Sequence, residues 1–150
     1  MKPVYSDQSV LYNQPSIFLA GPTPRAGGPE SWRKEALLIL DQLEFKDNVF
    51  IPEPSDGRWP EHYEEQVGWE YEALHACGLI VFWVPRSELM PGFTTNVEFG
   101  YWLRSGKILY GRPDWSIKNR YLDSMYEIET GMKPYDNLQS LLAEAVNKLK

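Results

Sequence analysis

Glu98 is the first residue whose type and position suggest chemistry. It follows the apolar run 79–84 after a short loop and falls in the opening turn of an expected helix, Thr95–Ser105. In a parallel sheet, a carboxylate at such a strand-to-helix junction faces the ligand crevice. The segment Thr95-Asn96-Val97-Glu98 also matches a capping box, in which the glutamate bonds back to the first amide of the helix. Both roles remain open from the sequence.

Glu70 is the second candidate, on a helix expected over residues 60–76. This helix is expected to bury a stripe of four residues, Tyr63, Val67, Leu74 and Cys77. The spacing 67, 70, 74 places Glu70 on that stripe. A carboxylate on an apolar face pairs with another group or has a raised pKa, and both are common in active sites. Alternatively, Glu70 lies at the edge of the stripe and reaches water.

Two carboxylates that converge on one crevice suggest glycosyl chemistry, in which one attacks or stabilises the sugar and the other positions it or moves a proton. Metal chemistry is not expected, because His62 and His75 are far apart and Cys77 has no partner at zinc-ligand spacing. With two histidines and no nucleophile elbow, a Ser-His-Asp hydrolase is also excluded. We therefore expect neither a metal nor another cofactor.

The elements that must position these glutamates alternate between strands and helices. Apolar runs predict strands at 17–20, 48–52, 79–84 and 108–110, and a weak strand near 133–135. Helical spacing predicts helices at 30–43, 60–76, 95–105, 119–130 and 138–149, whereas residues 1–15 read as a loose arm. The alternation predicts one α/β domain with a mostly parallel sheet of about five strands.

Composition narrows the class of protein further. The chain has 150 residues, 43% of them hydrophobic, and a formal charge of −6. This acidic balance argues against binding to a nucleic-acid polymer, which needs a cationic face. No apolar run is long enough to cross a membrane, and the start resembles no signal peptide. We expect a soluble, cytoplasmic protein.

The segment 21–28 is expected to lie at the carboxyl edge of the sheet, after the first apolar run. Its backbone amides, beginning at Gly21 and Pro22, are suited to cradle an anion or a sugar. It has neither a G-x-G-x-x-G nor a Walker A pattern, so it is a weak phosphate signal. Arg25 either contacts the substrate or is solvated.

Three short stretches stand in a distinctive order along the chain: Ile17-Phe18-Leu19-Ala20-Gly21-Pro22, Glu98-Phe99-Gly100-Tyr101 and Gly106-Lys107. Together they resemble the nucleoside 2-deoxyribosyltransferase family. Trp69-Glu70 and Phe82-Trp83-Val84-Pro85 resemble, more specifically, its nucleoside 2-deoxyribosyltransferase-like branch. The similarity runs from about Ile17 to Leu122.

The resemblance implies a flavodoxin-like, Rossmann-like three-layer sandwich and a covalent sugar–enzyme intermediate. The family's nucleophile is the glutamate of a Glu-x-Gly-Tyr motif, which corresponds to Glu98. An acidic residue of the preceding helix orients sugar or base, and it corresponds to Glu70. Family members form homo-oligomers that share active sites through an asparagine of the neighbouring subunit, for which Asn119 is the nearest match.

The chain departs from the family at three places. An aspartate that contacts the base shortly before the nucleophile is replaced by Gly92, with Asn96 closer in. Asparagine forms hydrogen bonds but cannot donate a proton as a carboxylic acid does. Phe18 stands where some members have an aromatic hydroxyl, and Cys77-Gly78 replaces the usual Ala-Asp. Base preference is therefore open.

The function expected from these residues and the resemblance is transfer of a 2′-deoxyribosyl group from a 2′-deoxynucleoside to a free nucleobase. Glu98, ionised at a helix N-terminus, attacks C1′, while Glu70 and Asn96 hold the sugar and the base. Trp83 and Trp69 are expected to supply a stacking wall. Two alternatives remain: an N-glycosidase of nucleosides or nucleotides on the same fold, and a non-catalytic nucleotide-binding module.

Overall fold

The computed structural model describes residues 1–12, 15–25 and 27–150, and five strands of these residues form one sheet. Its spatial order is β1 (Lys2–Tyr5), β3 (Asn48–Ile51), β2 (Ser16–Ala20), β4 (Leu79–Trp83) and β5 (Ile108–Gly111). Every neighbouring pair is parallel. The expected α/β, flavodoxin-like architecture is confirmed, with a sheet that is parallel throughout.

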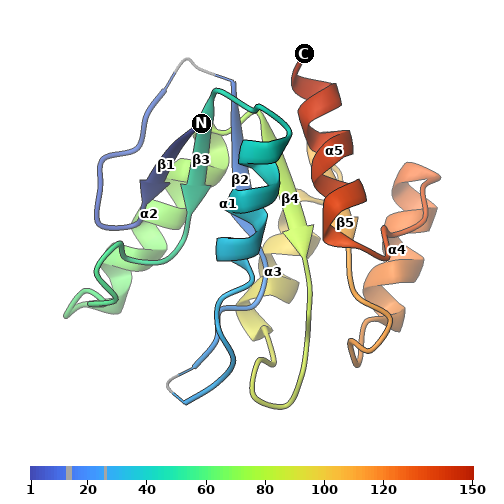
Figure 1. The fold of residues 1–150 in the computed structure, drawn as a ribbon. Helices are drawn as coiled ribbons and strands as arrows, with labels where there is room; N and C mark the ends of the chain where they lie inside the picture. Colours follow the sequence, from blue (N-terminus) through green and yellow to red (C-terminus); the bar gives the residue numbers. More distant parts are fainter. Residues whose placement is uncertain (13–14, 26) are drawn as a thin grey trace.

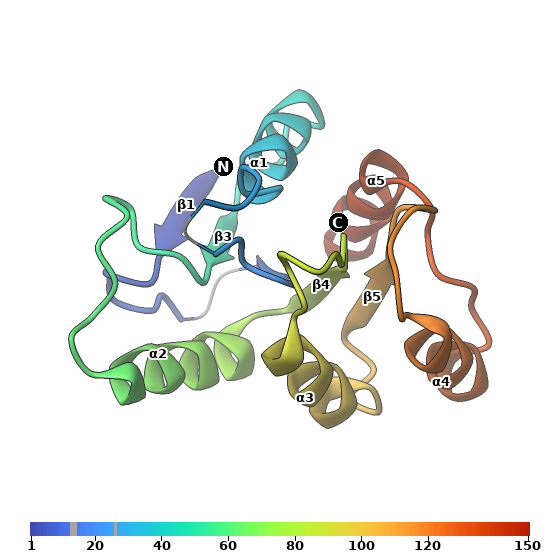
Figure 2. The same cartoon turned by 90° about the horizontal axis from the view of Figure 1, so that it is seen from below.

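Helices cover both faces of this sheet and complete three layers (Figures 1 and 2). On one face lie α1 (Arg33–Gln42) and α5 (Leu138–Leu149). On the other lie α2 (Tyr63–Ala76), α3 (Phe93–Trp102) and α4 (Arg120–Thr130). Within the described residues, no helix is long and apolar enough to cross a membrane.

The sequence accounts directly for the central strand and the last helix. All five residues of β4 are buried, and successive side chains enter opposite cores: Ile80 and Phe82 join one, Val81 and Trp83 the other. In α5, apolar residues at helical spacing are buried, and the Asn137 side chain caps the helix by accepting a hydrogen bond from Ser140 N at 2.8 Å. The expected helix 138–149 is confirmed at both ends.

The loose arm expected at residues 1–15 is wrong at residues 2–5, which form β1 against β3, whereas the described residues 6–12 and 15 belong to no helix or strand. This edge strand buries only Val4 fully, too little to show alternation in the sequence. Residues 13 and 14 of that arm lie outside the described residues. The weak strand expected near 133–135 is a single bridge between Gly111 and Tyr135.

The order of the strands reverses beside β2, and this reversal creates a crevice at the carboxyl edge of the sheet. From β2 the chain passes through α1 to β3 on one side, whereas β4 lies on the other side. The loops that follow β2 and β4 therefore diverge, which is where open α/β sheets bind ligands. Both loops lie at the lower edge of Figure 1.

Candidate active site

A cleft of about 230 Å³ occupies this crevice. The loop after β2 contributes Gly21, Pro22 and Thr23, and the chain after β3 contributes Pro52 and Trp59. The remaining walls come from α2 and from the start of α3, which supply Tyr63, Gln66, Glu70, Phe93 and Glu98 among others. The structure therefore brings four predicted site residues together: Gly21, Pro22, Glu70 and Glu98.

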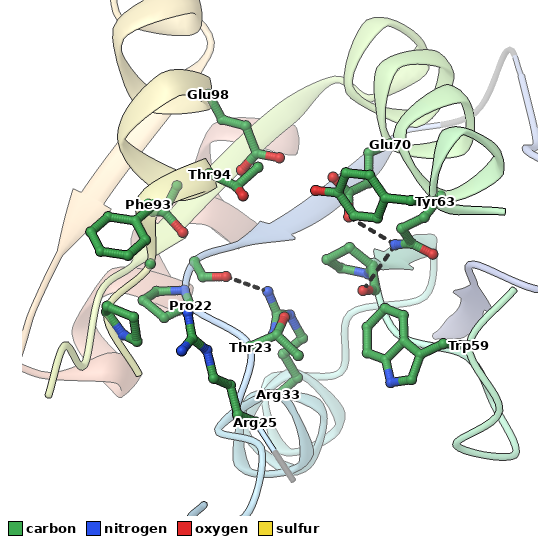
Figure 3. Close-up of a pocket in the computed structure, with 16 residues that line it drawn as sticks. Pro22, Thr23, Arg25, Arg33, Trp59, Tyr63, Glu70, Phe93, Thr94 and Glu98 are labelled. Carbon is green, nitrogen blue, oxygen red and sulfur yellow. Dashed lines mark hydrogen bonds between the residues drawn. The ribbon is translucent and has the colours of Figure 1, made fainter. Parts of the chain in front are cut away.

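Glu98 and Glu70 form a carboxyl pair across the cleft. Figure 3 shows Glu98 on α3 and Glu70 on α2 pointing toward one another. The two side chains are close enough to share a hydrogen bond. Because two ionised carboxylates repel at such a distance, a pair of this kind holds one proton over a wide pH range.

The expected capping box at Thr95 is wrong, because α3 begins earlier than its sequence suggests. The N-cap is Gly92, at a φ of 62°, and no side chain caps the helix. Thr95 is therefore the third residue of α3 and Glu98 the sixth, beyond the first turn. Glu98 is thus free of a capping role and reaches the cleft.

The expectation that a helix N-terminus keeps Glu98 ionised, with a low pKa, is also wrong. Burial, and then the charge of Glu70, raise the pKa of Glu98 to about 8. Burial likewise raises the pKa of Glu70, and the hydrogen bond from Gln66 opposes that rise. The helix dipole does not offset these effects, because its influence is confined to the first turn. In the free protein the pair therefore carries a proton at neutral pH.

The buried stripe expected on α2 is half right, because Leu74 and Cys77 are buried but Tyr63 and Val67 are not. Tyr63 is 66% exposed and Val67 47% exposed, whereas Gln66 and Trp69 are buried together with Ala73 and Leu74. The helix is rotated so that Glu70 lies at the edge of its buried face, half-buried, and lines the cleft. Tyr63 lies at the cleft too, rather than in the core.

Arg33, at the start of α1, fixes the loop that forms the cleft floor. Its side chain is 2% exposed and donates to Leu19 O at 2.9 Å, to Gly21 O at 2.7 Å and to Thr23 Oγ1 at 3.1 Å. It also forms an ion pair with Glu53 at 2.6 Å. Burial lowers the pKa of Arg33, and its neighbours Glu53, Glu98 and Glu70 counteract this. Arg33 is therefore a buried cation close enough to interact with both members of the carboxyl pair.

Gly21 allows the ends of β2 and β4 to approach closely. It adopts a φ of 146°, and a Cβ at this position would lie 2.0 Å from Trp83 O. A side chain here must push the β2–α1 loop away from β4, which would deform the cleft floor.

Replacing Gly21 with alanine should therefore lower the free energy of unfolding by about 3 kcal/mol or more, measured by urea denaturation. Gly57→Ala is the matched control, because Gly57 has a φ of 75° with no atom near its missing Cβ. That control should lose only about 1–2 kcal/mol, the cost of the left-handed backbone itself. Equal losses in both variants would show that the close approach to Trp83 is unimportant.

Four other predicted site residues lie outside the cleft. Trp69 is buried against Phe18 and Phe50, and its Nε1 donates to Gln8 O at 2.7 Å. Trp83 belongs to the core beneath α1 and α5. Asn96 accepts a hydrogen bond from Arg86 in the groove between α3 and α4.

Asn119 is also enclosed in its own protomer, because it is buried and donates to Ser116 Oγ.

The aromatic residues that line the cleft are Trp59, Tyr63 and Phe93. Figure 3 shows Tyr63 beside Glu70, Trp59 below it on the same side of the cleft, and Phe93 on the opposite wall. The sequence analysis did not identify them as cleft residues, nor did it identify Arg33 and Gln66. The sequence feature that could have identified Trp59 as a cleft residue is its place in a Pro- and Gly-containing loop after an apolar run. Over the described ranges, no group of three His, Cys, Asp or Glu residues is placed to hold a metal ion.

Comparison with known proteins supports the family resemblance that the sequence motifs suggest. A family model described as "Nucleoside 2-deoxyribosyltransferase like" matches residues 14–114, more than half of the 150-residue chain. The resemblance inferred from the short stretches at 17–22 and 98–101 is thereby confirmed. No curated protein matches the chain.

Proposed function

Because the chain belongs to the nucleoside 2-deoxyribosyltransferase-like family, we propose that it moves a 2′-deoxyribosyl group between nucleobases. In this proposal Glu98 attacks C1′, the first base leaves, and a second base displaces Glu98 with net retention at C1′. The observation that carries the proposal is the Glu98–Glu70 pair in a cleft at the reversal point of the sheet.

The surroundings of the pair suit a small, flat, neutral substrate. Carboxyl groups on α2 and α3 face a cleft of about 230 Å³, whose dimensions fit a small molecule rather than a polymer. Trp59, Tyr63 and Phe93 provide aromatic surfaces on which a base can stack. Arg33 stabilises negative charge on the pair from below, because it lies near both glutamates.

A base-exchange assay tests this proposal. The protein is incubated with a 2′-deoxynucleoside, with and without a second free base, and the products are separated by chromatography. A new deoxynucleoside that forms only with the second base supports transfer. Release of free base at the same rate without an acceptor would instead identify an N-glycosidase. Absence of turnover with purine and pyrimidine donors and their 5′-monophosphates would favour a binding module.

We also propose that a second copy of the chain covers the outer side of the pair. A mostly apolar groove of about 210 Å³ lies between α2 and α3, lined by Val67, Tyr71, Val97 and Tyr101, and both glutamates border it. These four side chains are 47–72% exposed, which is costly for large apolar groups gathered in one patch. A partner on this face would exclude water from the carboxyl pair.

Replacing Tyr101 with lysine should convert the oligomer to a monomer and reduce transfer, as measured by light scattering and base exchange. The matched control is Tyr121→Lys on α4, because Tyr121 is 75% exposed and Tyr101 is 64% exposed. The control should keep the wild-type mass. A monomeric wild-type protein with full activity would contradict this interface.

A further inference from the structure

Gln66 lies one helical turn before Glu70 on α2 and contacts it directly. Its side chain is only 5% exposed and lines the cleft. Its Nε2 donates one hydrogen bond to Glu70 Oε1 at 2.8 Å and another to Pro52 O at 3.3 Å. A buried glutamine is uncommon, and this one uses both of its N–H donors on two acceptors.

The contact with Pro52 fixes which end of the Gln66 amide faces Glu70. If the amide were flipped, its oxygen would face a backbone carbonyl oxygen and a carboxyl oxygen, and neither offers a donor when Glu70 is ionised. Gln66 therefore presents an N–H to Glu70. Such a donor stabilises the carboxylate form of Glu70 over the protonated form.

The two members of the carboxyl pair are consequently not equivalent. Glu70 accepts a hydrogen bond from Gln66 at 2.8 Å, so it is the better site for the negative charge. Glu98 has no N–H donor of its own among the described residues and lies in the more buried position. The single proton of the pair therefore belongs on Glu98.

The charged group that acts on the pair from outside it, Arg33, acts on both members. Arg33 on α1 is near Glu70 and Glu98 alike, and its charge is partly balanced by Glu53. Arg25 and Tyr63 also line the cleft. Among the described residues, Gln66 is the one that donates a side-chain hydrogen bond to Glu70, and it makes none to Glu98.

We propose that Gln66 is a positioning residue that keeps Glu70 as the anion and the proton on Glu98, and that this one proton is transferred to the leaving base. The part of this inference that concerns transfer of the proton to the base rests on the proposed function.

The proposed step balances without any other acid. As Glu98 attacks, its proton passes to Glu70 and from there to the base nitrogen. The C1′–N bond breaks, an ester bond between C1′ and Glu98 forms, and the neutral protonated base leaves. Attack by a second neutral base reverses each movement and returns the proton to Glu98. No external acid, base or water is consumed.

The test is a carboxyl titration by NMR on protein labelled at the glutamate side-chain carboxyl carbon, with Glu98→Gln and Glu70→Gln for assignment. In the wild type we expect the resonance of Glu98 to titrate near pH 8. In Gln66→Met, the proton should shift toward Glu70 and the midpoint of the pair should rise by about one pH unit. The exposed Gln139→Met on α5 is the control and should change nothing.

Base exchange measured against pH provides the second readout. Transfer should be lost above the midpoint of the pair, and Gln66→Met should move that alkaline limit upward while lowering kcat. The inference is overturned if Glu70 rather than Glu98 titrates at the higher pH in the wild type, a result that needs no folded Gln66 variant. It is also overturned if folded Gln66→Met titrates like Gln139→Met. If the titrations agree but no base is exchanged, the proposed function fails and the placement of the proton stands.

Discussion

Glu98→Gln is expected to lower deoxyribosyl transfer by at least about 10⁴-fold, because an amide cannot form the glycosyl ester. Base exchange under saturating donor and acceptor measures this loss. Glu88→Gln is the matched control, since Glu88 lies exposed in the β4–α3 connection, ahead of the helix that carries Glu98, and outside the cleft. Glu88→Gln should keep wild-type activity. Activity retained in Glu98→Gln would remove Glu98 from the mechanism.

The same variant should be folded and more stable than the wild type at alkaline pH. The pKa of Glu98 is about 8 in the folded protein and about 4.3 in an unfolded chain. Protonation of Glu98 therefore adds to the free energy of unfolding. This contribution is fully present below about pH 4 and is lost as the pH rises through about 8. Glutamine stays neutral, so the melting temperature of the variant relative to the wild type should rise between pH 5 and 9. Thermal unfolding across that range measures the difference.

Arg33→Met should cost about 3–5 kcal/mol of unfolding free energy. The substitution leaves Glu53 without its ion-pair partner and removes the donors to Leu19 O and Gly21 O. Urea denaturation measures the loss, and transfer should fall as well because the loop at Gly21 is released.

The control for Arg33 is its neighbour on the same helix. Lys34 pairs with Glu30 at 2.6 Å, but both side chains are more than two-thirds exposed, at 71% and 73%. Lys34→Met should therefore leave the urea midpoint unchanged. Arg33→Met combined with Glu53→Gln should recover part of the loss, since no charge then remains unpaired. A small loss in Arg33→Met alone would show that the loop at Gly21 has other support.

How well each element could be predicted from the sequence depends on how many of its side chains are buried. The residues of β4 are all apolar and covered on both faces, so the sequence alone locates this strand. The strand β1 has a single fully buried side chain at the edge of the sheet, and nothing local separates it from a loop. The starts of helices were predicted less well than their middles. For α3, the start depends on the left-handed backbone of Gly92, which composition does not reveal.

The two glutamates could be predicted as cleft residues because each depends on one element and its neighbouring strand. The roles of Gln66 and Arg33 could not, because they depend on Pro52, Glu53 and Gly21, which are distant in the sequence. The pKa of Glu98 was misjudged for the same reason: its main causes are burial and a carboxyl on another helix. Trp69 and Trp83 were expected at the cleft from their type, yet both complete cores.

The measurement that tests the central claim most directly is the mapping of the covalent intermediate. The protein is mixed with a 2′-deoxynucleoside without acceptor, quenched in acid, digested with trypsin and analysed by mass spectrometry. A deoxyribosyl adduct is predicted on the peptide 87–104, with fragmentation placing it on Glu98 and not on Glu88. An adduct on the peptide 59–86, which contains Glu70, would contradict the account, as would rapid base exchange with no adduct.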